Sequence, residues 1–270
     1  MPQIICLANS WKFEERCIAG IDRTTGAWIR PISDLYPEDG RVPPNVRLIE
    51  NQEPALLDIL EIPLASDGND FGFESENRTI IAGTWRRVGQ VKAEDLLAYC
   101  DNSTDILHTS EKYVSVSYLQ SLPFAERRTL QLIYVPQLAV REVPRDKGGR
   151  KWLGTIVTKA GQQLSNLSIT DPAFVARLEY GYVLRNPCLV TVSLSMPYQP
   201  SGEWTDAVCW KLIAGVIELT ESDQIMVEIR RLGWSLEQGR SVLQERFGRR
   251  SRTQLNQQEL IAFLTYLKSL

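Results

Sequence analysis

The first thirty or so residues contain three short segments in which apolar, often β-branched residues dominate, and each segment ends at a turn. They span residues 3–9, 16–22 and 27–31, and the last turn contains residues 24–26, Thr-Thr-Gly. Short runs of this kind bounded by turn residues are typical of β-strands. The chain is therefore constrained to begin with a β-rich unit, and polar or aromatic side chains stand where its strands end.

Strand-like segments continue to about residue 219, and a short helix is expected at residues 93–99 in the first half. The strand-like segments are residues 55–63, 129–139, 152–157, 188–195 and 209–218. We expect residues 152–157 to return antiparallel to residues 129–139 through a turn at 146–151, where Gly148 and Gly149 permit positive φ. Two successive units of short strands predict paired small barrels.

The composition changes at Thr220, after which three helices are expected. Each begins with a capping box, in which a side chain at the first position and one three residues later satisfy each other's backbone N–H groups. The pairs are Thr220 with Asp223, Ser235 with Gln238, and Asn256 with Glu259. Gly233 and Gly248 suit the ends of the first two helices.

The predicted fold is therefore mainly β, and α+β overall: two OB-like β-barrels followed by a small three-helix bundle. We expect the first barrel at residues 1–118, the second at 119–219 and the helical module at 220–270.

Charge and cysteine content limit the expected ligands and the expected cellular compartment. The net charge is −3 and the isoelectric point is near 5.5, so nucleic-acid binding would depend on a local basic patch. No apolar run reaches the ~18 residues of a membrane-spanning helix, and the N-terminal residues lead us to expect no secretory signal. The five cysteines are odd in number and scattered, which predicts reduced thiols and a cytoplasmic protein.

Catalytic motifs are sparse. His108 is the one histidine, and no Gly-x-Ser-x-Gly elbow, Cys-x-x-Cys pair or phosphate-binding glycine loop accompanies it. We expect His108 to hydrogen-bond a backbone carbonyl. We also expect no catalytic residue, cofactor or metal, and solvated carboxylates in the polar loops. The loop carboxylates are Asp34, Glu38, Asp39, Asp67, Asp70, Glu74 and Glu76.

Basic residues gather beside aromatic residues in two places, and a third basic cluster lies near the C-terminus. The first place is the predicted hairpin, with Arg141, Arg145, Lys147, Arg150, Lys151 and Trp152. The second is the N-terminal unit, with Asn9, Trp11, Lys12, Arg16, Trp28 and Arg30. The C-terminal cluster is Arg246, Arg249, Arg250 and Arg252, between the last two helices. Cationic residues for the backbone and rings for base stacking are what single-stranded nucleic acid requires.

Simpler interpretations remain open for each cluster. The hairpin charges also suit a soluble surface, Trp28 also suits a core position, and the C-terminal arginines also suit a helix C-terminus.

Several sequence pieces resemble the dual OB-containing domain family of bacterial proteins. The N-terminal pieces are residues 7–12 (LANSWK), 16–20 (RCIAG) and 26–31 (GAWIRP). The later pieces are residues 57–59 (LDI), 74–77 (ESEN), 106–108 (ILH), 169–172 (ITDP) and 209–214 (CWKLIA). The resemblance implies two OB-type barrels that bind nucleic acid or a related ligand, often in genome defence or DNA processing. The tail is similar to a small helical module at the C-termini of cyanobacterial proteins.

Together these observations predict a non-catalytic protein that binds single-stranded DNA or RNA. The residues expected to bind are Trp11, Lys12, Arg16, Arg30, Arg145, Lys147, Arg150, Lys151, Trp152, Arg249, Arg250 and Arg252. One alternative is a protein-interaction adaptor that uses residues 220–270. Another is a nucleotide-processing enzyme with a metal held by Asp22, Asp58 or Asp171, which requires two of these carboxylates within about 4–6 Å. A shared face for the hairpin and the N-terminal cluster favours the nucleic-acid groove, and opposite faces favour the adaptor.

Overall fold

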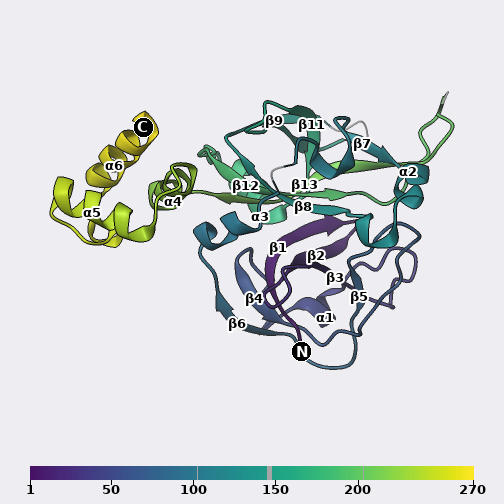
Figure 1. The fold of residues 1–270 in the computed structure, drawn as a ribbon. Helices are drawn as coiled ribbons and strands as arrows, with labels where there is room; N and C mark the ends of the chain where they lie inside the picture. Colours follow the sequence, from purple (N-terminus) through teal and green to yellow (C-terminus); the bar gives the residue numbers. More distant parts are fainter. Residues whose placement is uncertain (102, 145–147, 203) are drawn as a thin grey trace.

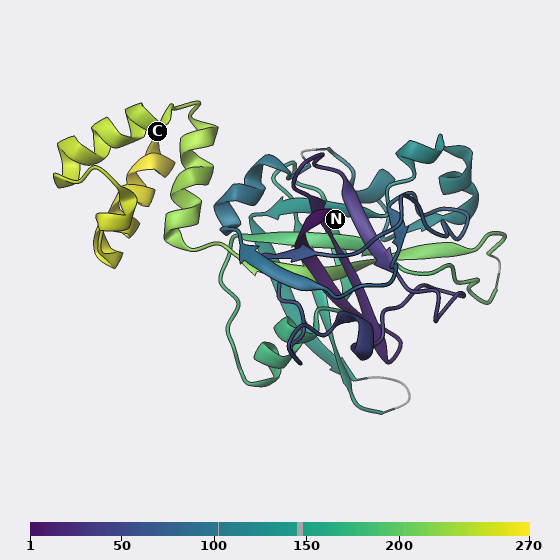
Figure 2. The ribbon, with the colours of Figure 1, turned by 90° about the horizontal axis from the view of Figure 1, so that it is seen from below.

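A computed structural model describes residues 1–101, 103–144, 148–202 and 204–270. It contains two mixed β-sheets followed by helices (Figures 1 and 2). The first sheet has the order β5-β3-β2-β1-β4-β6. Its strands are β1 (Gln3–Lys12), β2 (Glu15–Asp22), β3 (Trp28–Ile32), β4 (Asp58–Glu61), β5 (Asn77–Thr79) and β6 (Arg86–Gln90). The three opening strands are confirmed, and β1 and β2 form an antiparallel pair.

The second sheet has the order β8-β12-β13-β11-β10-β9, and β7 pairs with β13 beside this path. Its strands are β7 (Tyr113–Ser115), β8 (Leu130–Val135), β9 (Gln137–Pro144), β10 (Arg150–Val157), β11 (Gln163–Ile169), β12 (Cys188–Leu194) and β13 (Val208–Glu218). The boundary at residues 118 and 119 stays a prediction, and β7 joins the second sheet a few residues before it.

The single long strand expected at residues 129–139 is wrong. The chain forms two strands there, β8 paired with β12 and β9 paired with β10, and the break falls at Pro136. Proline has no N–H to donate to a sheet, which explains the interruption. The antiparallel return of β10 is confirmed, and Gly148 and Gly149 have φ of 86° and 81°.

Short helices connect the strands. They are α1 (Pro44–Arg47), η1 (Ala93–Ala98), η2 (Ile106–His108), α2 (Val116–Ser121), η3 (Phe124–Glu126) and α3 (Pro172–Glu179). The helix expected at residues 93–99 is thus a 3-10 helix, η1.

The two sheets pack closely because small residues face each other. Ala8, Ala19 and Ala214 form one buried cluster with Leu130. The pairing of β1 with β2 shifts between Cys6 and Ala8, and there the Leu7 carbonyl accepts a 2.7 Å hydrogen bond from Thr191 of the second sheet. The end of β1 is fixed in the same way, because the Trp11 N–H donates to the Thr170 carbonyl at 2.8 Å.

The C-terminal module consists of α4 (Glu221–Arg231), α5 (Leu236–Phe247) and α6 (Gln257–Ser269), with η4 (Arg252–Gln254) between the last two. All three predicted capping boxes are present. The module has its own core around Ile225 and Phe263, and it stands to one side of the sheets (Figure 1). No helix in the described part of the chain is long and apolar enough to cross a membrane.

Candidate nucleic-acid interface

The end of β1 carries two exposed rings at the junction of the sheets. The Trp11 side chain is 39% exposed, and Phe13, in the turn that follows with φ of 55°, is 71% exposed. Both rings line a hollow of about 460 Å3 whose opposite wall includes Lys151 and Trp152 of β10. The N-terminal cluster and the cationic hairpin therefore share one face, at Trp11 and Lys151.

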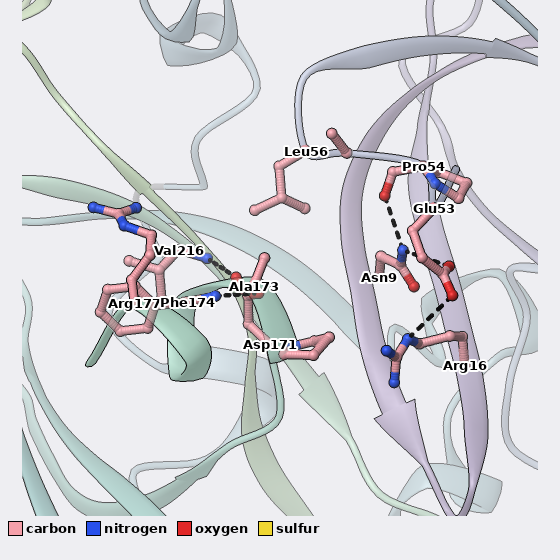
Figure 3. A pocket seen from close by; sticks show the side chains of 12 residues that line it. Asn9, Arg16, Glu53, Pro54, Leu56, Asp171, Ala173, Phe174, Arg177 and Val216 are labelled. Carbon is pink, nitrogen blue, oxygen red and sulfur yellow. Dashed lines mark hydrogen bonds and ion pairs between the residues drawn. The ribbon is translucent and has the colours of Figure 1, made fainter. Parts of the chain in front are cut away.

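A second, larger cleft of about 510 Å3 has Arg16 in its lining (Figure 3). The Arg16 guanidinium lies 5.7 Å from the centre of the Trp11 ring and 4.0 Å from the Glu53 carboxylate. Arg16 Nε is buried without a hydrogen-bond partner among the described residues, and burial lowers the Arg16 pKa. The Arg16 guanidinium is the least engaged cation of this cleft.

Glu53 does not neutralise Arg16, because a neighbouring arginine holds its carboxylate. Arg47 donates to both Glu53 oxygens at 2.9–3.1 Å and pairs with Glu15 at 2.6 Å. Burial alone would raise the Glu53 pKa, but hydrogen bonds from Arg47 and Asn9 outweigh it and lower the pKa. Neither Arg47, the last residue of α1, nor Glu53, in the irregular segment that follows, was predicted, because neither belongs to a motif.

The opposite wall of the cleft is the start of α3 (Figure 3). Asp171 caps this helix, since its two oxygens accept hydrogen bonds from the N–H groups of Phe174 at 3.0 Å and Val216 at 3.1 Å. Burial raises the Asp171 pKa, although these N–H groups oppose the change. Its position indicates a structural carboxylate.

The other two carboxylates of the enzyme alternative also have structural partners. Asp58 is fully buried and accepts hydrogen bonds from Arg87 and Gln90, each at 2.8 Å. Asp22 accepts from the N–H groups of the turn at Thr24 and Thr25. In the part of the chain that the structure describes, no group of three or more His, Cys, Asp or Glu residues is placed to hold a metal.

Arg30 is not a surface cation, so its expected place in a basic surface patch is wrong, while its role in nucleic-acid binding stays a prediction. It is 2% exposed and pairs with Glu74 at 2.7 Å, while its Nη2 donates to Thr129 at 2.7 Å. Glu74 and Glu76 were expected in a solvated loop, and this is also wrong, since both are buried. A buried guanidinium requires buried acceptors, and this loop supplies them.

The remaining N-terminal candidate, Lys12, is half-buried. Its ammonium donates a hydrogen bond to the Asp39 carbonyl and lies 5.9 Å from the centre of the Phe71 ring. Its charge is therefore partly engaged by the protein.

The hairpin residues differ in their surroundings. Lys151 is exposed, and Arg150 is exposed but pairs with Glu142 across the hairpin at 2.9 Å. Trp152 is half-buried and packs against the core of the second sheet. Arg145 and Lys147 lie outside the described residues.

The C-terminal arginines line none of these hollows. Arg249 and Arg250 are exposed between α5 and η4. Arg252 forms an ion pair with Glu94 of η1 and so joins the helical module to the barrels, and its role in nucleic-acid binding stays a prediction. His108 behaves as expected, with Nε2 2.8 Å from the Arg128 carbonyl, and burial lowers its pKa.

Comparison with known proteins gives two findings. The model of the family described as the dual OB-containing domain matches residues 2–216. An uncharacterized protein, slr1353, of Synechocystis sp. is 36% identical over 73 residues, which are 27% of this chain and 25% of that protein. The match thus spans a quarter of the relative's length. No solved structure matches the chain.

Proposed function

Because the chain belongs to the dual OB-containing domain family, we propose that it is a non-catalytic protein that binds single-stranded DNA or RNA across the junction of its two sheets. The observation that carries this proposal is the hollow shared by Trp11, Phe13, Lys151 and Trp152. OB-type domains bind oligonucleotides on one face, where rings stack on bases and cations follow the phosphates.

The roles follow from exposure and charge. The exposed rings of Trp11 and Phe13 stack on successive bases. Lys151 on one side and Arg16 on the other attract the phosphates, because neither forms an ion pair closer than 4.0 Å among the described residues. Local charge of this kind suffices even though the whole chain has a net charge of −3.

The test is fluorescence anisotropy with labelled single-stranded DNA and RNA at several salt concentrations. We expect Trp11→Ala to weaken binding by about fivefold to a hundredfold, which corresponds to the loss of one stacked base. Lys151→Gln should reduce the slope of log affinity against log salt by about 0.7. The matched control is Lys159→Gln, which removes an exposed lysine just beyond the far end of β10 and should change neither quantity.

The absence of salt-sensitive binding by the folded wild-type protein at low salt would contradict the proposal. An equal effect of Lys159→Gln and Lys151→Gln would contradict the location of the interface.

The second candidate function is a protein-interaction adaptor, and exposed apolar side chains on the helical module favour it. Leu236 is 58% exposed, Ile261 48% and Leu270 53%. A partner bound in this way is lost when residues 220–270 are deleted, so a pull-down that survives the deletion contradicts the adaptor function.

A further inference from the structure

A third pocket lies on the other side of Trp11, between the two sheets. Its volume is about 360 Å3, which falls in the ~300–1,000 Å3 range of small-molecule sites. The first sheet contributes Trp11 and Arg30, the turn after β1 contributes Phe13, and the segment after β12 contributes Met196 and Tyr198. The pocket shares Trp11 and Phe13 with the hollow of the proposed interface, so a strand bound there passes its mouth.

The floor of this pocket is the buried pair of Arg30 and Glu74, each 2% exposed. The pair leaves one donor and one acceptor without partners among the described residues. Arg30 Nε has no hydrogen bond, and the Glu74 contacts with Arg30 and Asn77 all use Oε2, which leaves Oε1 free. Buried polar groups are rarely left unpaired in native proteins, so the buried and unpaired Arg30 Nε points to a ligand.

The charge of the floor selects against an anion. Arg30 faces Glu74 directly and lies near Glu76, whose oxygens accept from the N–H and hydroxyl of Thr129. Lys12 also lines the pocket, but its ammonium already donates to the Asp39 carbonyl. At the floor, one guanidinium among two buried carboxyl groups offers no excess positive charge to a phosphate. A neutral group with its own donor and acceptor suits this floor better.

The rim of the pocket is aromatic. Trp11, Phe13 and Tyr198 are 39%, 71% and 57% exposed. Rings around a floor that offers one donor and one acceptor match a flat heterocycle, whose faces stack and whose edge carries both kinds of polar group.

We propose that this pocket captures a single nucleobase turned out of the bound strand, with its edge hydrogen-bonded to Arg30 Nε and Glu74 Oε1 and its face stacked on the rim. This inference rests on the proposed function and adds a base-reading subsite to it. It also gives the buried Arg30 a role that differs from a phosphate contact.

Cys17 provides a direct test, because this half-buried free thiol lines the pocket. Cys100, also half-buried but outside the pocket, is an internal reference. The rate of iodoacetamide alkylation at each cysteine is measured by mass spectrometry, with a saturating oligonucleotide, the four nucleosides and inorganic phosphate as separate additions. We expect the oligonucleotide to slow alkylation of Cys17 at least about fivefold, since thiol reactivity requires access. Nucleosides should also protect Cys17, phosphate should not, and Cys100 should react at its free rate throughout.

Two variants test the rim and the floor. Tyr198→Ala should raise the nucleoside concentration needed for half-protection by about fivefold or more. Tyr180→Ala is its matched control, because Tyr180 is 92% exposed and lines none of the pockets described above. Glu74→Gln should weaken protection of Cys17 in the same assay. Because this change breaks a buried pair, the exposed Tyr198 variant keeps the test independent of folding.

The outcomes separate the subsite from the proposed function. Oligonucleotide binding in the anisotropy assay together with unprotected Cys17 would overturn the subsite alone. Protection by phosphate equal to that by nucleosides would also overturn it. The absence of oligonucleotide binding would contradict the proposed function.

Discussion

At the scale of single residues, Lys211 is a buried cation whose charge the fold stabilises poorly. It lies in β13, is 1% exposed, and donates from Nζ to the carbonyl of Thr109 at 2.6 Å and to its hydroxyl at 3.1 Å. Burial lowers the Lys211 pKa to about 8, and the nearby charges of Asp105 and Glu111 only partly oppose this. The folded state thus binds the lysine proton less tightly than the unfolded chain does.

The stability of the protein should therefore depend on Lys211 at alkaline pH. The unfolded lysine titrates near pH 10.4, so between about pH 8 and pH 10.4 the unfolded chain holds a proton that the folded chain has lost. The contribution of Lys211 to stability rises with pH across this interval, by roughly 3 kcal/mol. Urea denaturation of the wild type and Lys211→Met at pH 8 and pH 10.4 measures this change as a difference between the two proteins.

Other groups titrate in the same interval, but they do so in both proteins and cancel in that difference. A difference in unfolding free energy that stays constant from pH 8 to pH 10.4 would show that Lys211 is charged inside the folded protein.

Other residues show which placements local sequence can predict. The contact of His108 with a backbone carbonyl was predicted, since a lone histidine without a catalytic partner most often has such a role. The pair of Arg30 and Glu74 could not be predicted. Its members are 44 positions apart, and the residues around Glu74 are polar and turn-forming, which is equally typical of an exposed loop.

At the scale of elements, the irregularity in β1 determines how the sheets meet. The register shift around Leu7 frees its carbonyl from the ladder of β1 with β2, and Thr191 of β12 binds it. Gly215 of β13 passes over the same carbonyl, where a Cβ would lie 2.3 Å from the oxygen. Glycine is needed at position 215 for this close approach.

Gly215→Ala should therefore destabilise the protein by about 1–3 kcal/mol or more, because backbone of one sheet must move away from the other. Gly89→Ala is the matched control in strand β6. A Cβ there lies 3.3 Å from the terminal methyl of Ile59, which can move. Chemical denaturation of both variants measures the contrast, and equal midpoints and slopes would contradict the close packing at Leu7.

Elements defined by neighbouring residues were predicted well, and elements defined by distant contacts were not. The three helix starts depend on residues three positions apart, and all three were correctly predicted. Pro136 breaks residues 129–139 locally, but the partner of each half, β12 or β10, lies elsewhere in the chain and could not be predicted. The shared face of Trp11 and Lys151 also depends on contacts between distant parts of the chain. The sequence alone therefore left open whether these two residues lie on the same face.

At the scale of the whole molecule, the helical module packs against the barrels beside η1. Val227 of α4 packs against the cluster that contains Leu96 of η1, and Arg252 forms an ion pair with Glu94 of the same helix. The two charged side chains are only 17% and 12% exposed, so the pair is largely shielded from water. Pairs of this kind couple two parts of a structure more strongly than exposed pairs do.

Arg252→Gln should therefore loosen the module without weakening nucleic-acid binding. Hydrogen exchange of the amides in α4, α5 and α6 should become faster, and adding Glu94→Gln should speed it little further, because the same pair is already broken. Oligonucleotide affinity should stay within about twofold of the wild type, since the ion pair lies outside the interface. Arg249→Gln, an exposed neighbour in the loop before η4, is the control and should change neither measurement. If Arg252→Gln weakened binding as much as Lys151→Gln, the C-terminal arginines would belong to the interface after all, and the module would serve nucleic-acid recognition.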